Sequence, residues 1–295
     1  MFSGPLLLQS IILGVLLGGL YALLAAGLTL YFGVMRVVMI AHAAFLVLAA
    51  YLAWFFNQQT GLDPLLSLVI TVPLFFGMGV LMQRMLISRL RPATLTMMSV
   101  LLTFAIAMFI EGMLGFVWSG TQRRIQLGYS GASIEFFGAH IAVVKMIAFA
   151  LAALSLAGLS LLLKKSRMGQ ALRATIQHKE AAQLVGINTE RIASYGFGLG
   201  LALAAIGGTA LSLDSTIYPS LHWRWIGPLM AIIVVGGLGS IAGAAAAAMM
   251  LGLAQSLLQL PMGTTWAQTV FYIALFATLI LRPQGFFGGR LAQRF

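Results

Sequence analysis

The sequence predicts an all-α membrane protein, a polytopic bundle of about eight transmembrane helices, and two observations lead to this fold class. The first is composition, because 61% of the 295 residues are hydrophobic, 8% are charged, and the mean hydropathy is +1.01. A soluble protein of this size could not bury so much apolar surface, whereas a membrane bundle exposes it to lipid. The second is pattern, since apolar residues form runs of roughly 17 to 25, the length that crosses a bilayer.

The first half of the chain contains five such runs, at residues 6–32, 37–56, 64–82, 95–118 and 141–163. No basic residue precedes Arg36, so we expect the first run to remain as a span and not to be cleaved as a signal peptide. Gly14 and Gly18 lie on one face of this run and allow a close helix contact. The segment 119–140 is polar and too short for a domain.

The second half contains further runs at residues 192–213, 226–260 and 266–281, and the segment 214–225 between the first two is expected to be an interfacial connector. The run 226–260 is too long for one span, and its cluster Gly236-Gly237-Leu238-Gly239-Ser240 weakens a continuous helix. We therefore expect a short or re-entrant half at 226–235, a break near Gly236–Ser240, and a full helix after it. Eight and nine crossings both remain open.

Backbone broken at membrane depth is tolerated where protein or a water-filled cavity covers it. The glycine break is therefore a candidate for lining a path. A tight crossing of small residues is the alternative, and the sequence does not decide between the two.

The longest charged connection, residues 164–191, carries six of the seventeen basic residues. A basic connection of this kind is expected in the cytoplasm, which puts the N-terminus outside and the C-terminus inside. It is longer than a simple connection needs, so we expect it to contain structure. Residues 168–175 and 180–185 are predicted to be short helices, with Gly186 and Asn188 as a stop. Such helices would offer a handle to a soluble partner; a solvated loop that only sets orientation is the alternative.

Composition and motifs exclude several classes of function. The charge of +11 comes from residues at span ends and in loops, where they suit anionic lipid headgroups at the membrane surface. They form no basic stripe interleaved with exposed aromatic residues that would bind nucleic acid. There is no cysteine, and the four histidines include no close pair for a metal. No Gly-x4-Gly-Lys-Ser/Thr segment holds nucleotide phosphates. Ser240 lacks a serine-protease frame, and Asp63 and Asp214 fall in connectors. We expect no catalytic residue, metal or cofactor.

Three polar residues within the runs are candidates for a function in transport. His42 is a candidate because an ionisable side chain inside a span is by default a functional one. The alternative is that His42 is neutral and satisfies a backbone carbonyl in a helix contact. Glu111 faces a substrate ammonium or Arg123, or lies at the interface. Gln255 is a path residue or a hydrogen-bonding contact between helices. Because no chain of intramembrane carboxylates exists, the energy for transport is expected to come from elsewhere.

Several separated motifs follow one another between residues 14 and 288: GLYAL at 19–23, GLTLYFGVMR at 27–36, Ala41-His42, SRMGQALRA at 166–174, AQLVGIN at 182–188, GGLGSIAGA at 236–244 and RPQGFFG at 282–288. Each motif alone is weak, but together and in this order they are specific. By them the chain resembles the LivH-type permease subunit of bacterial ABC importers for branched-chain amino acids.

The resemblance implies one transmembrane permease domain over residues 1–295, with a cytoplasmic ATPase-coupling loop at 164–191. Glu180-Ala181-Ala182 with Gly186 resembles the segment whose short helix docks in a cleft of the ATPase. The expected coupling residues are Arg167, Gly169, Arg173, Glu180, Ala181, Ala182 and Gly186. The expected path residues are His42, Gly236, Gly237, Gly239, Ser240 and Gln255.

The resemblance also implies the partners and the location of the chain. Cytoplasmic ABC ATPase subunits, a second permease subunit in a heterodimer, a periplasmic or extracellular substrate-binding protein and membrane lipids are expected, in a bacterial inner membrane. Ala43 replaces the glycine that usually follows His42, and Gln255 stands where relatives often have glutamate. Urea and short-chain amide permeases share much of this pattern, so they remain an alternative, as does an ion-coupled secondary transporter. An intramembrane enzyme is disfavoured because the catalytic frames are missing.

Overall fold

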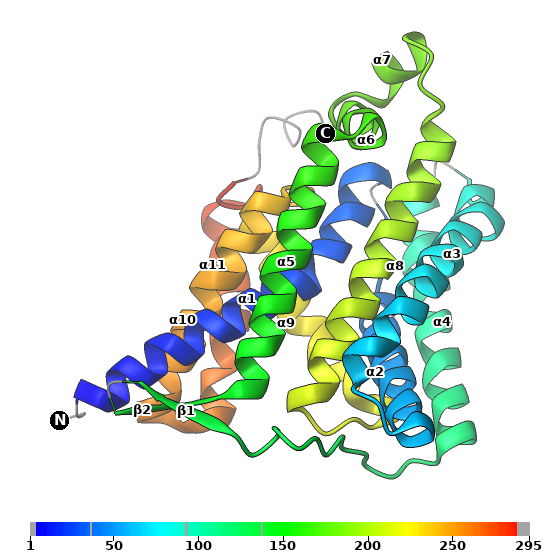
Figure 1. Ribbon diagram of the computed structural model, residues 1–295. Coiled ribbons are helices and arrows are strands. Elements are labelled where there is room, and N and C mark those ends of the chain that lie inside the picture. The colour runs from blue at the N-terminus through cyan, green and yellow to red at the C-terminus, as the bar shows by residue number, and fades with distance from the viewer. Residues whose placement is uncertain (1–3, 36, 92–93, 137, 288–295) are drawn as a thin grey trace.

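The computed structural model describes residues 4–35, 37–91, 94–136 and 138–287 and confirms the all-α membrane bundle (Figure 1). Its helices are α1 (Gly4–Met35), α2 (Ala41–Thr60), α3 (Leu68–Met85), α4 (Leu95–Trp118), α5 (Val143–Lys165), α6 (Arg167–Gln177), α7 (Lys179–Leu184), α8 (Thr189–Asp214), α9 (His222–Gly236), α10 (Ile241–Ala267) and α11 (Thr269–Leu281). Short 3-10 turns are η1 (Pro64–Ser67), η2 (Ile87–Arg89) and η4 (Pro219–Leu221), and one hairpin pairs β1 (Ser133–Phe136) with β2 (Ala139–Ala142). Within these residues, seven helical segments are long and apolar enough to cross a membrane, and α11 is a shorter apolar helix.

The centre of the bundle is built from α1, α2 and α8, which are buried along most of their length. Tyr31 of α1 packs against Phe197 of α8, with ring centroids 4.5 Å apart. Gly14 and Gly18 confirm the close contact that their spacing predicts, because a Cβ there would lie 2.9 Å from Leu253 Cα and 2.8 Å from Met249 Cα of α10. Small residues thus bring the backbones of α1 and α10 together without a large core side chain between them.

The outer faces of α3, α4, α5 and α11 carry large apolar side chains that no other part of the chain covers, among them Val69, Phe109, Leu154 and Phe276. In water such faces would promote aggregation. Lipid tails solvate them, so they are the part of the fold that the hydropathy of the sequence predicted.

The second helix begins at Ala41, so the prediction that it begins at residue 37 is wrong. Residues 37–40 are not helical, and Thr103 of α4 binds their backbone. The Ile40 N–H donates to Thr103 Oγ1 over 3.2 Å, and this hydroxyl lies 3.2 Å from the Val38 carbonyl oxygen. A hydroxyl from a neighbouring span therefore replaces the helical hydrogen bonds that a continuous helix would make.

The connector predicted at 214–225 ends earlier than expected, because α9 begins at His222 and includes Trp223 and Trp225. Pro219 stands at the first position of η4, where its fixed φ starts a helical turn that continues into α9. The polar segment 119–140 contributes the hairpin, which the sequence did not predict.

The two ends of the bundle differ in charge, and Figure 1 shows α6 and α7 at one end and the hairpin with the start of α1 at the other. The described basic residues at the α6–α7 end are Arg84, Arg89, Arg91, Lys164, Lys165, Arg167, Arg173, Lys179, Arg191 and Arg282, against the acidic residues Glu180 and Glu190. Those toward the opposite end are Arg123, Arg124, Lys145 and Arg224, against Asp63, Glu111, Glu135 and Asp214. Only the α6–α7 end is strongly basic.

Candidate coupling loop and translocation path

The helix α6 is anchored to the bundle by packing. Ser166 caps its N-terminus, with its Oγ accepting the Gly169 N–H over 2.9 Å. Gly169 lies directly on α5, where a Cβ would overlap the backbone of Leu162 and Leu163. Leu172, one turn further along, is fully buried and reaches α8. These contacts tie α6 to both α5 and α8.

The helix α7 is stabilised chiefly by hydrogen bonds at its own ends. Its predicted stop at Gly186 is confirmed: Gly186 has a φ of 83°, its N–H donates to the Gln183 carbonyl, and the Ile187 N–H donates to the Ala182 carbonyl, both over 3.0 Å. This is a Schellman motif, which needs a residue that adopts left-handed φ without strain. Ala182 is the buried residue of α7, and Glu180 and Ala181 are exposed.

Two apolar side chains after Gln183 point away from the bundle. Leu184 is 89% exposed and Val185 is 76% exposed. They stand beside the exposed Glu180 and Ala181 on a short helix that extends beyond the rest of the bundle (Figure 1). These exposed apolar residues make α7 a candidate docking surface for another protein.

The glycine break joins α9 to α10 in a tight turn. Gly237 and Gly239 have φ values of 93° and 86°, and Ser240 caps α10 by accepting the Gly243 N–H over 3.1 Å. α9 starts close to Ile217, which pairs with Arg123 at the hairpin end of the bundle, and it ends beside the α6 end of α1. It therefore runs through the bundle and does not dip back, and α10 returns beside it.

The structure places the break near α6, with Gly33 of α1 close to both. A Cβ on Gly33 of α1 would lie 3.4 Å from Gly239 Cα and 3.7 Å from Ile176 Cδ1 of α6. Beside this contact lies a pocket of about 500 Å³. Its walls are formed by α5, α6 and the start of α10, and they include Arg173, Ile176, Gln177, Gly239, Ile241 and Ala242. Two groups of residues that the sequence singled out separately thus share one pocket.

A second pocket, of about 180 Å³, lies on another side of the break. Its lining is apolar throughout: Leu28, Phe32, Val37, Val38, Met39, Met230, Ile233, Val234 and Leu238. The non-helical residues 37–39 form one wall. The sequence missed this pocket, because nothing local links Thr103 to the backbone that it binds. The only local signal was the break between the first two runs.

His42 and Gln255 make contacts between helices. His42 Nε2 lies 2.9 Å from the Leu24 carbonyl oxygen, which can only accept, and Nδ1 lies 3.4 Å from the Tyr31 hydroxyl. Gln255 Oε1 accepts the Tyr21 hydroxyl over 2.7 Å. Both side chains are buried, and neither lines the two pockets described above. Their part in a path stays a prediction.

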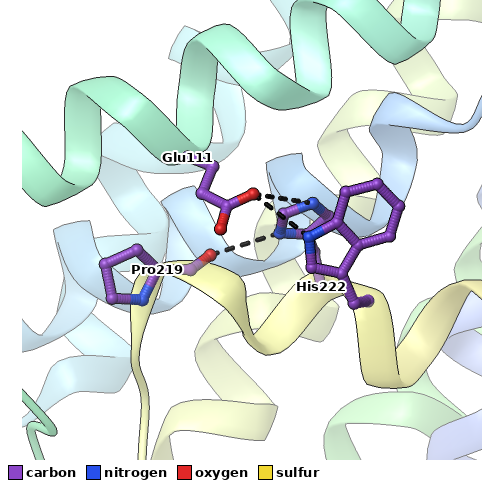
Figure 2. Close-up of polar contacts among 4 residues, drawn as sticks. Glu111, Pro219 and His222 are labelled. Carbon is purple, nitrogen blue, oxygen red and sulfur yellow. Dashed lines mark hydrogen bonds and ion pairs between the residues drawn. The ribbon is translucent and has the colours of Figure 1, made fainter. Parts of the chain in front are cut away.

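Glu111 meets two residues from the start of α9 (Figure 2). The Trp223 Nε1–H donates to Glu111 Oε2 over 3.1 Å, and His222 Nε2 lies 3.6 Å from the same oxygen. Arg123 is not the partner of Glu111, because it donates to the Trp118 carbonyl and lies over the Trp54 ring. Within the described ranges no cluster of three His, Cys, Asp or Glu side chains could hold a metal.

Comparison with known proteins gives matches along almost the whole chain. The profile of the family described as branched-chain amino acid transport system / permease component matches residues 10–279. The high-affinity branched-chain amino acid transport system permease proteins LivH of Salmonella typhimurium and BraD of Pseudomonas aeruginosa are 27% and 26% identical, each over 95% of both chains. The probable branched-chain amino acid transport permease protein LivH of Methanocaldococcus jannaschii is 27% identical over 93% of this chain and 90% of its own. No solved structure matches the chain.

Proposed function

The chain belongs to the family of branched-chain amino acid transport system permease components, and from this premise we propose that it is the permease subunit of an ABC importer for branched-chain or other apolar amino acids. The resemblance to LivH-type permeases is thereby confirmed. The loop at 164–191 is then the site at which cytoplasmic ABC ATPase subunits act. A second permease subunit and an external substrate-binding protein complete the importer.

One observation supports this proposal most: the single residue His178 joins the exposed helix α7 to the anchored helix α6, and α6 lines one pocket together with the glycine break. When the ATPase subunits close on ATP, they move α7. Because Gly169 and Leu172 tie α6 to α5 and α8, the movement passes into the spans and not only into the loop. The movement then reaches the turn between α9 and α10 through Ile176, Gly33 and Gly239. A shift of this turn switches the path between outward and inward access.

The charge of the two ends supports a cytoplasmic location for α6 and α7. Basic residues gather at this end, and positively charged loops remain on the inner face of the membrane. The N-terminus is then outside and the C-terminus inside, in the inner membrane of a bacterium. Anionic headgroups of the inner leaflet would contact the same residues.

The apolar pocket beside the break supports an apolar side chain as cargo. All of its lining residues are apolar, so it offers a branched aliphatic group contacts and offers an amide no side-chain hydrogen bond. This favours amino acids with apolar side chains over urea and short-chain amides, which remain the second candidate because their permeases share the motif pattern.

Reconstitution tests the proposal. The chain is placed in proteoliposomes alone, or together with the ATPases, second permease and binding protein that copurify with it from its native membrane. Uptake of labelled leucine, isoleucine, valine and urea is then measured with and without ATP. We expect amino-acid uptake only with all components and ATP. Uptake by the chain alone along an ion gradient would contradict the proposal. Labelling of the Glu180→Cys variant from outside intact cells would also contradict it, because it would place α7 on the outer face.

A further inference from the structure

The contact between Glu111 and His222 lacks one hydrogen-bond donor. His222 Nδ1 lies 3.2 Å from the Pro219 carbonyl oxygen, which can only accept, so Nδ1 carries a proton. In the neutral imidazole, Nε2 then presents a lone pair to Glu111 Oε2, 3.6 Å away. The His222 side chain has 0% exposure, and its Nε2 has no hydrogen-bond partner within the described part of the chain. Two acceptors that face each other are unfavourable until a positively charged donor neutralises the carboxylate.

The free side of Glu111 is open and lies beside aromatic rings. Its side chain is 24% exposed. Trp223 and Phe104 stand next to each other, with centroids 5.9 Å apart, and each is 44% exposed. The indole N–H holds one carboxylate oxygen in place (Figure 2). A carboxylate beside aromatic rings is the arrangement that binds an ammonium group, through charge-assisted hydrogen bonds and cation–π attraction.

The position of Glu111 along α4 indicates what lies in front of it. It stands inside a 24-residue apolar helix, two turns before the end at Trp118. A carboxylate at such a depth faces a water-filled cavity or another protein group, not lipid tails. In the described residues no Lys or Arg side chain pairs with it, and a neutral His222 leaves its charge unmatched.

We propose that Glu111 binds the α-ammonium group of an amino-acid substrate at the hairpin end of the bundle, with Phe104 and Trp223 framing the ammonium and the Trp223 N–H positioning the carboxylate. This inference rests on the proposed function and deepens it. An ammonium on the open side of Glu111 neutralises the carboxylate and removes its repulsion of the His222 lone pair. Urea and simple amides carry no ammonium group, so this site selects amino acids.

The test uses Glu111→Gln in the complete importer, at saturating binding protein. The amide keeps an oxygen for the Trp223 N–H but removes the charge. We expect leucine uptake to fall roughly tenfold, the effect of losing one charged hydrogen bond. Glu111→Asp should recover part of the uptake. Glu135→Gln, which neutralises an exposed acid in β1 near the same end, should transport like the wild type.

The outcomes separate this inference from the proposed function. Copurification of Glu111→Gln with the ATPases and an unchanged melting temperature show that the variant importer assembles. If it then takes up leucine at the wild-type rate, the ammonium site is overturned and the importer function stands. If the wild-type importer carries urea or amides and no amino acid, the substrate part of the proposed function fails as well.

Discussion

The helices α6 and α7 are neighbours in one basic loop, yet different kinds of contact hold them in place. α6 is packed on two spans, through Gly169 against α5 and Leu172 against α8. α7 has six residues, buries one of them, and depends on the hydrogen bonds at its ends. A helix so short is not stable in isolation. The loop therefore has two parts, a helix fixed to the bundle and a short exposed helix, which we propose as the lever and the handle for an ATPase subunit.

The largest effect is expected from breaking the anchored part. Gly169→Leu forces a side chain into the backbone of α5, and overpacking of this kind typically costs about 1–3 kcal/mol. We expect a lower melting temperature and a lower yield of monodisperse protein in detergent. Gln170→Leu, at the exposed neighbouring position, is the matched control and should leave both unchanged. Equal stability of the two variants would show that α6 is not anchored as described.

The next effect concerns the handle and should leave the fold intact. Glu180→Lys reverses the acidic charge on α7. Gly186→Trp places an indole where a Cβ would meet nothing within 4 Å, and its φ of 83° strains only the end of α7. We expect both variants to insert in the membrane normally, to lose ATP-driven uptake, and to copurify with less ATPase. Glu135→Lys, the same charge change on β1 at the opposite end of the bundle, is the control. Normal uptake by both α7 variants would remove the coupling role of this helix.

A smaller effect is expected from the exposed apolar residues of the handle. Replacing Leu184 and Val185 by serine removes apolar surface that only a partner could bury. We expect ATPase binding to the chain in nanodiscs to weaken by about tenfold, in line with about 1.5–3 kcal/mol for each fully buried apolar side chain and incomplete burial here. The melting temperature of the isolated chain should not change, whereas a lower value would mean that these residues pack within the bundle.

The smallest effect isolates the left-handed residue at the end of α7. Gly186→Ala introduces a Cβ at a φ of 83°, which costs about 1 kcal/mol without any steric clash. We expect faster hydrogen exchange at the Ile187 amide, which closes the helix end on Ala182. Gly131→Ala, at an open position without positive φ, should leave exchange unchanged. Unchanged exchange in Gly186→Ala would show that the turn does not limit the stability of α7.

The parts of this protein that the sequence determined by itself are those whose hydrogen bonds are local. In lipid each span must satisfy its own backbone, so an apolar run of sufficient length is already a helix, as residues 95–118 show. Gly186 ends α7 for a local reason too, since only its own φ and the carbonyls just before it are involved. The break near Gly236–Ser240 is also determined locally, by the backbone angles of its own glycines.

Apart from the face of Gly14 and Gly18, whose contact the sequence predicts, only the tertiary structure decided which faces of these helices meet. Lipid is as apolar as the interior of the bundle, so hydrophobicity does not mark the buried side of a span. For this reason the sequence could not show that Thr103 binds residues 37–40, that α6 and the glycine break line one pocket, or that His222 faces Glu111. These contacts join segments far apart in the chain, and they depend on the shapes of packed helices and not on any local pattern.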